Sequence, residues 1–285
     1  MPLTAVKLED RGVLAVSGPE ARDFLQTILT NDIRRATPDR AIYAALLTPQ
    51  GKYLFDFFIV EEDGVLLIDC ERARKDELLR KLMLYRLRAK AEIVDRSDDL
   101  AVWALVGEAD EDRPSLESAK PGTLFADPRL AEMGWRASLP ADAGSPAKPA
   151  EREAYETRRL ALGLPDGSRD FEVDRTLALE GNLDLLGAVD FEKGCYVGQE
   201  ITARMKHRGK VRKRLLPVHG NSGDLSGGAE IRAGGKPVGD LRSVLGDRGI
   251  ALLRLDALEA GGLEAGGVSV SVIRPSWLEA PASPA

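Results

Sequence analysis

The chain has 285 residues, with 40 Lys and Arg against 46 Asp and Glu, and a formal net charge of −6. Hydrophobic residues make up 44% and charged residues 30%, which excludes wholesale disorder and coiled-coil architectures. The apolar run 41–47 is too short to cross a membrane, and the first residues do not resemble a secretory signal. Because only Cys70 and Cys195 are present, a disulfide framework is excluded, and we expect a soluble, cytoplasmic protein.

The first part of the chain is typical of an antiparallel α+β unit. Strands are expected at 13–17, 41–47, 53–60, 65–70, 91–95 and 101–106. The spacing of Phe24, Leu25 and Ile28 predicts a helix between the first two strands, with Ser17 and Glu20 at capping-box spacing. A second helix is expected over 72–90, and its inward residues would be Leu78, Leu79, Leu82 and Met83. Regular βαβ alternation is missing, which argues against a doubly wound fold.

The second part of the chain changes in composition and in expected secondary structure along its length. We expect an exposed loop at 108–121, a strand at 134–139, a linker at 140–149 and a helix at 151–162. After residue 210 the chain holds 13 of its 28 glycines, which separate short apolar runs. Short strands joined by glycine turns favour a small β-barrel or sandwich.

The most informative segment is KGCYVGQE, which spans Lys193 to Glu200. The glycines on either side of Cys195-Tyr196 allow positive φ or close approach to a ligand. Lys193 and a helix beginning near Val197 would both stabilise a thiolate, and that helix would let Glu200 pair with Arg204. From the residues alone, Cys195 could be a nucleophile, a metal or cluster ligand completed in trans, a redox thiol or a small buried hydrophobe.

This octapeptide resembles the signature of the YgfZ family, which includes the mitochondrial iron–sulfur cluster assembly factors. That family belongs to the folate-binding superfamily of the glycine-cleavage T-protein. Further similar blocks lie at 24–33, 46–59, 159–167, 179–204 and 235–255. The ungapped run through Arg204, His207 and Gly209 is similar to the mitochondrial branch in particular.

The resemblance implies an α+β fold, a three-domain cloverleaf of the T-protein type around a central folate cavity. Residues 1–45 and 148–210 would form a discontinuous α+β domain, and 46–147 an inserted one. Residues 211–285 would form the C-terminal β-barrel.

The function implied is that of a folate-binding accessory factor for assembly or repair of 4Fe–4S clusters, more an assembly factor than a turnover enzyme. Cys195 would act by sharing a transient cluster with an iron–sulfur carrier or client protein, since one motif cysteine cannot hold a cluster alone. The alternative is a folate-dependent aminomethyltransferase of the T-protein type. Asp56 stands where those relatives carry the first of two adjacent acids, and Phe57 breaks the pair, which argues against the transferase.

Tetrahydrofolate or a derivative is the cofactor that the resemblance implies. The residues expected around it are Asn31, Asp32, Asp56, Glu180, Asn182, Lys193, Tyr196, Gln199, Glu200 and Arg204. Three alternatives remain open. Asp32 could cap a turn, Tyr43 could fill the core rather than stack on the pterin, and Asp56 could face solvent at a strand edge.

The stretch from Arg204 to Arg214 has seven Lys and Arg in eleven residues and no acid. This stretch could bind a folate polyglutamate tail, an acidic carrier protein or RNA phosphates. Alternatively, it could be the solvated start of a β-strand. In such a strand the alternating Lys206, Arg208 and Lys210 would share one face. Because the stretch lacks aromatic residues for base stacking, nucleic acid is not an expected partner.

Overall fold

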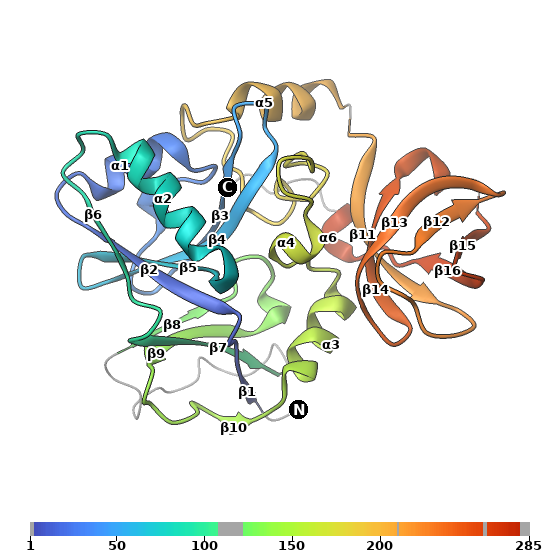
Figure 1. Cartoon of the computed structure of the whole chain (residues 1–285), viewed down its shortest axis with the longest axis horizontal. Coiled ribbons are helices and arrows are strands. Elements are labelled where there is room, and N and C mark those ends of the chain that lie inside the picture. The colour runs from blue at the N-terminus through green and yellow to red at the C-terminus, as the bar shows by residue number, and fades with distance from the viewer. Residues whose placement is uncertain (1–2, 108–121, 210, 259–260, 280–285) are drawn as a thin grey trace. The chain divides into compact units, whose positions relative to one another are not determined.

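The computed structural model describes residues 3–107, 122–209, 211–258 and 261–279 (Figure 1). Backbone contacts divide the chain into two compact units. The first unit comprises 1–47, 54–155 and 186–197, and the second comprises 48–53, 156–185 and 198–285. The three-domain division expected from the sequence stays a prediction, and the loop expected at 108–121 lies outside the described residues.

The first unit contains two five-stranded sheets, one of which has the order β10-β1-β7-β9-β8. Its strands are β1 (Thr4–Lys7), β7 (Leu100–Val106), β8 (Thr123–Ala126), β9 (Trp135–Pro140) and β10 (Lys148–Pro149). Trp103 and Leu105 on β7, with Ala137 and Leu139 on β9, lie in one apolar cluster. Their spacing of two residues is the strand period, so one face of this sheet is buried.

The second sheet has the order β3-β4-β5-β2-β6. Its strands are β2 (Arg11–Ser17), β3 (Ile42–Leu47), β4 (Tyr53–Glu62), β5 (Val65–Glu71) and β6 (Glu92–Asp95). The hairpin predicted at Asp63-Gly64 is confirmed: these residues join β4 to β5 and have φ values of 50° and 83°. Positive φ at both positions is what a tight two-residue hairpin requires.

Two helices lie beside this second sheet, α1 (Ala21–Ile28) and α2 (Lys75–Arg86) (Figure 1). The apolar face predicted for α1 is confirmed, with Phe24, Leu25 and Ile28 buried. The predicted capping box is wrong, because the Glu20 carboxylate instead accepts a hydrogen bond from the backbone N–H of Lys90. α2 is shorter than predicted, and Met83 is 43% exposed.

The second unit contains the C-terminal strands, which form a closed barrel in the order β11-β14-β13-β12-β15-β16. They are β11 (Lys213–Gly220), β12 (Glu230–Ala233), β13 (Lys236–Leu245), β14 (Arg248–Arg254), β15 (Leu263–Ala265) and β16 (Val268–Val272). β16 pairs with β11, which closes the barrel and leaves no open edge between them. The predicted small barrel is therefore confirmed.

Four further α-helices lie among the described residues. They are α3 (Arg152–Leu162), α4 (Gly167–Asp170), α5 (Gln199–Arg208) and α6 (Ser276–Glu279). The helix predicted at 151–162 is confirmed as α3. The strand entry considered for the basic stretch is wrong for Arg204 to Arg208, which belong to α5.

Shorter 3₁₀ turns lie between these elements. They are η1 (Ile33–Arg35), η2 (Arg72–Arg74), η3 (Ala131–Met133) and η4 (Leu255–Ala257). No helix within the described ranges is long and apolar enough to cross a membrane.

A buried ion pair stabilises the helical part of the second unit. The guanidinium of Arg159 lies 2.8 Å from the carboxylate of Asp170, and both side chains are fully buried. The other carboxylate oxygen of Asp170 accepts a hydrogen bond from the backbone N–H of Ser243 on β13. This pair thus links α3 and α4 to the barrel within one unit.

Candidate functional site

Cys195 lies exposed on a loop whose neighbouring side chains are buried. Lys193 is 8% exposed and Tyr196 is 7% exposed. Gly194 and Gly198 have φ values of 98° and 87°, a region that residues with a Cβ rarely adopt. The loop is therefore anchored on both sides of the thiol, and the interpretation of Cys195 as a small buried hydrophobe is wrong.

Lys193 fastens this loop to the C-terminal end of α1. Its Nζ donates hydrogen bonds to the carbonyl oxygens of Gln26 at 2.6 Å and Leu29 at 2.5 Å. It also lies 5.5 Å from the centre of the Tyr196 ring. Burial lowers the pKa of Lys193 to about 8, although the nearby carboxylates of Asp32 and Asp190 act in the opposite direction.

Gln26 makes a second link between α1 and the loop. Its Nε2 donates to the carbonyl oxygen of Lys193 at 3.3 Å, and its Oε1 accepts from the backbone N–H of Ile33 at 2.9 Å. Helix ends leave carbonyl groups without partners inside the helix. Here Lys193 supplies the donors, so its ammonium points at α1 and serves as an anchor.

Asn31 and Asp32 follow α1 and hold a turn. The Asn31 amide donates to the carbonyl oxygens of Tyr43 at 2.8 Å and Gly187 at 2.7 Å. The Asp32 carboxylate accepts from the backbone N–H of Arg34 at 3.0 Å, so it caps η1 as the turn interpretation expects. Hydrogen bonds from the Arg34 side chain lower the pKa of Asp32 to about 2.

Asp56 lies inside the second sheet, and the solvent-facing alternative is wrong. It is 4% exposed, and its Oδ2 accepts a hydrogen bond from the Tyr43 hydroxyl at 2.9 Å. Tyr43 is 1% exposed, which confirms its place in the core. Because Asn31 bonds to the Tyr43 carbonyl, the predicted residues Asn31 and Asp56 are linked through one tyrosine.

A cluster of buried arginines in the first unit was missed by sequence reasoning. The guanidinium carbons of Arg136 and Arg129 lie 4.1 and 4.9 Å from the centre of the Phe58 ring. Arg136 pairs with Asp69 at 2.5 Å, and Arg129 pairs with Asp127 at 2.7 Å. The sequence signal for this cluster is an arginine within a short apolar run, and Arg136 occupies such a run on β9.

The predicted residues of the second unit have mainly structural partners. Asn182 is fully buried with φ 61°, and its amide donates to the carbonyl oxygen of Leu215 at 2.5 Å. The Glu180 carboxylate accepts from the backbone N–H of Leu177 at 3.1 Å. The ion pair predicted between Glu200 and Arg204 is confirmed at 2.5 Å, and Gln199 begins α5.

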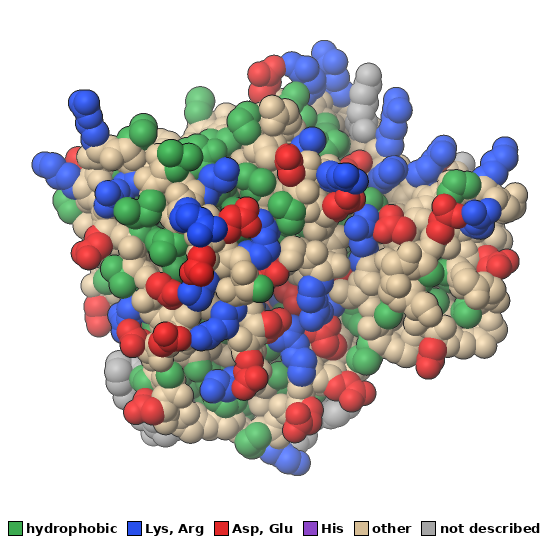
Figure 2. All heavy atoms as spheres, in the orientation of Figure 1, with side chains coloured by type: hydrophobic (Ala, Val, Ile, Leu, Met, Phe, Trp, Pro, Cys, Tyr) green, Lys and Arg blue, Asp and Glu red, His purple; other side chains and the backbone are tan. Residues whose placement is uncertain are grey.

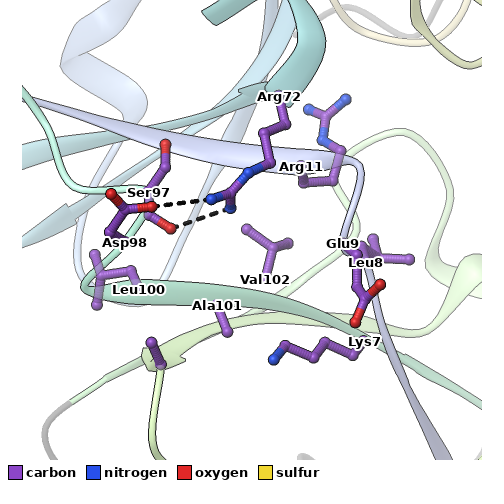
Figure 3. A pocket seen from close by; sticks show the side chains of 11 residues that line it. Lys7, Leu8, Glu9, Arg11, Arg72, Ser97, Asp98, Leu100, Ala101 and Val102 are labelled. Atoms are coloured by element: carbon purple, nitrogen blue, oxygen red, sulfur yellow. Dashed lines mark hydrogen bonds and ion pairs between the residues drawn. The ribbon is translucent and has the colours of Figure 1, made fainter.

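A separate cleft of about 390 Å³ lies in the first unit (Figure 3). It is lined by residues from β1, β2 and β7, and Arg72 reaches across part of it. The Arg72 guanidinium donates to the carbonyl oxygen of Ser97 at 3.1 Å and to Asp98 at 3.0 Å. None of the site residues predicted from the sequence lines this cleft.

Cysteine chemistry differs between the two thiols. Cys70 is 2% exposed on β5, and burial raises its pKa to about 12, which makes it a poor nucleophile and a poor metal ligand. Within the described ranges, no three His, Cys, Asp or Glu side chains cluster closely enough to hold a metal ion.

Fold and comparisons agree on the class of protein. A GCVT N-terminal domain matches residues 7–112, and a CAF17 C-terminal β-barrel domain matches residues 212–280. The solved glycine cleavage system aminomethyltransferase T from Bartonella henselae superposes with a TM-score of 0.78 at 16% identity, over 98% of this chain and 87% of that one. The chain is therefore an α+β protein of the GcvT-like fold with a closed, six-stranded C-terminal barrel.

Two mammalian relatives narrow the class to a family. The mitochondrial iron–sulfur cluster assembly factor IBA57 of Homo sapiens is 36% identical, over 87% of this chain and 76% of that protein. The Mus musculus protein of the same name is 34% identical, over 96% and 85%. The chain belongs to the IBA57 iron–sulfur cluster assembly factor family, which confirms the resemblance seen in the sequence.

The cytoplasmic location expected from the sequence is contradicted by these relatives, both of which are named as mitochondrial proteins. The expectation rested on the short apolar runs, on first residues unlike a secretory signal and on the small number of cysteines. A small number of cysteines does not distinguish one reducing compartment from another.

Proposed function

We propose that this protein assists the assembly or repair of 4Fe–4S clusters by offering the Cys195 thiolate to a cluster held by a carrier or client protein. The observation that carries this proposal is the exposed thiol in a loop that Lys193 and Tyr196 anchor. Membership of a family whose relatives are named iron–sulfur cluster assembly factors supports it.

The ligand count favours a shared cluster. A 4Fe–4S cluster takes about four cysteine ligands, whereas this chain has two cysteines and one of them is buried. Cys195 can therefore supply one ligand, and the others come from the partner. The cluster is cargo in this account, and the partner is the protein that gives or receives it.

Anchoring the loop prepares the thiol for that exchange. The hydrogen bonds of Lys193 to Gln26 and Leu29 limit how far the loop can move before a partner binds. A thiol that is already positioned loses less conformational freedom on ligation. Thiols bind iron as thiolates, so the Cys195 thiol gives up its proton on ligation and the partner thiolate that it displaces from that iron takes one up.

Tetrahydrofolate remains a proposed ligand on the strength of the sequence blocks shared with the folate-binding superfamily. Three of the expected residues fit it poorly, because Asn31, Asn182 and Lys193 already donate to backbone carbonyl oxygens. Asp56, buried against the Tyr43 hydroxyl, is the acid that would meet a pterin. No step of the proposed exchange passes through folate.

The test compares two activities in cells that lack this gene. One assay measures a 4Fe–4S enzyme, and the other measures glycine cleavage in the same extract. We expect the cluster enzyme to lose activity and glycine cleavage to survive. Loss of glycine cleavage with an intact cluster enzyme would show that the protein is a one-carbon transferase and would overturn the proposal.

A further inference from the structure

A cationic surface on α5 and β11 stands out in a chain whose net charge is −6. We define the α5–β11 surface by its exposed basic side chains, which are Arg204, His207, Arg208, Arg212 and Lys213. Figure 2 shows Lys and Arg side chains gathered over α5 and the start of β11. We propose that this surface docks the acidic face of the protein partner that shares a cluster with Cys195, an inference that rests on the proposed function.

The helix presents three basic residues on one side. Arg204, His207 and Arg208 are spaced at i, i+3 and i+4, which places them on one face of α5. Thr202 is the buried residue of this helix, whereas Glu200, Arg204, His207 and Arg208 are exposed. A partner can therefore contact several of these side chains together.

Part of the charge is already neutralised within the unit. Arg204 pairs with Glu200, Lys206 lies 3.9 Å from Asp184, and Arg254 pairs with Asp256. In contrast, Arg208 and Arg212 make no ion pair with any residue that the structure describes. These two guanidinium groups are available to carboxylates from another protein, and Arg is well suited to bind them bidentately.

Helix stability explains only part of this pattern. Basic residues in the last turn of a helix interact favourably with its dipole, and Lys206, His207 and Arg208 occupy that turn. The effect fades within about one turn, so it does not account for Arg212 and Lys213, which follow the helix. Helix stability therefore does not explain why Arg212 and Lys213 are basic.

The α5–β11 surface includes part of a cleft. It has a volume of about 590 Å³ and is lined by Val211, Arg212, Lys213, Arg254, Leu255 and Asp256. Two apolar residues sit among the cations, as expected of a site that receives a side chain or a short segment of a protein. The lining and the stretch 204–214 contain no Phe, Tyr or Trp, which disfavours single-stranded nucleic acid as the occupant.

Sequence proximity connects this surface to the proposed cluster exchange. Only four peptide units join Cys195 to Gln199, the first residue of α5. A chain of that length spans at most about 14 Å. A partner whose ligands reach Cys195 therefore comes close to the start of α5.

The test uses the full chain and a fluorescein-labelled oligoglutamate peptide as the acidic probe, with binding followed by fluorescence anisotropy. The variant is Arg208→Glu with Arg212→Glu, and Arg80→Glu with Arg88→Glu is a charge-matched control at exposed positions in the first unit. We expect the first pair to weaken binding about tenfold or more and the control to change it little. Binding should also weaken as salt increases.

Several outcomes would overturn the inference. These are failure of the wild type to bind oligoglutamate, equal loss in the control pair, or tighter binding of an oligouridylate RNA than of the peptide. Arg208→Gln with Arg212→Gln, which removes charge without reversing it, should give a smaller loss and guards against misfolding. Cys195→Ala should bind the peptide as tightly as wild type, so a failure of docking is distinguishable from a failure of the thiol's proposed role.

Discussion

The Nζ atom of Lys193 donates a hydrogen bond of 2.5 Å to the carbonyl oxygen of Leu29, the C-cap residue of α1. A lysine in the sequence motif thereby supports a helix that lies more than 160 residues earlier in the chain. The exposed thiol two residues further on is positioned through this bond. The motif predicts that Lys193 stabilises the thiolate, whereas in the structure its ammonium donates to carbonyl oxygens at the end of α1.

Lys193→Met should destabilise the protein, because two carbonyl oxygens lose a buried donor. Each unsatisfied group costs about 1–3 kcal/mol, so the free energy of unfolding should fall by an amount of that order. Chemical denaturation of wild type and variant at neutral pH measures this change. Lys236→Met, at an exposed position, is the matched control and should have little effect.

Comparison of wild type with Lys193→Met also reports the pKa of Lys193. In the folded chain this pKa is about 8, below the usual value of 10.5. Between these pH values the unfolded chain keeps a proton that the folded chain has lost, so stability rises with pH. The free energy of unfolding of wild type, minus that of Lys193→Met, should increase from pH 8 to 10.5. A flat or falling difference would show that burial does not lower this pKa.

Thiol labelling should separate the two cysteines. An aromatic disulfide reagent should modify exposed Cys195 rapidly in the native protein, whereas Cys70 should react only after unfolding, because burial raises its pKa to about 12. Absorbance should therefore report one thiol per native chain and two per unfolded chain. Rapid labelling of both thiols in the native state would contradict the burial of Cys70 on β5.

Gly181→Ala should destabilise the second unit. A Cβ at this position would lie 2.1 Å from a ring carbon of Phe171, which itself stacks on Tyr53 at 4.5 Å between ring centres. Overpacking of this kind costs about 1–3 kcal/mol. Thermal unfolding measures the loss. Gly144→Ala is the control, because a Cβ there meets nothing within 4 Å, and an equal loss in both variants would contradict the packing described.

The elements that follow strong periodic patterns were predictable from the sequence. The apolar face of α1 and the glycine-separated strands of the barrel are examples, since burial of one face produces a regular spacing. Short strands such as β1 and β10 escaped because two to four residues carry no period, and their pairing depends on distant partners. The start of α5 was predicted as a helix beginning near Val197, but its last residues were left open between helix and strand, since the alternating cations carry no apolar pattern.

The candidate site was predictable only to the level of its motif. KGCYVGQE identified Cys195 and its flanking glycines, whose positive φ values follow from local chemistry. The partners of Lys193, Asn31 and Asp56 could not be predicted, because each is bonded to a residue brought near by folding. The buried Arg129 and Arg136 escaped for the same reason.

The central claim is that the exposed thiol of Cys195 serves cluster assembly, and rescue of a 4Fe–4S enzyme tests it most directly. Cells lacking this gene would receive wild type, Cys195→Ala or Cys70→Ala at matched protein levels. We predict that wild type and Cys70→Ala restore enzyme activity and that Cys195→Ala does not. Full restoration by Cys195→Ala would contradict the account and leave the motif cysteine without the role proposed for it.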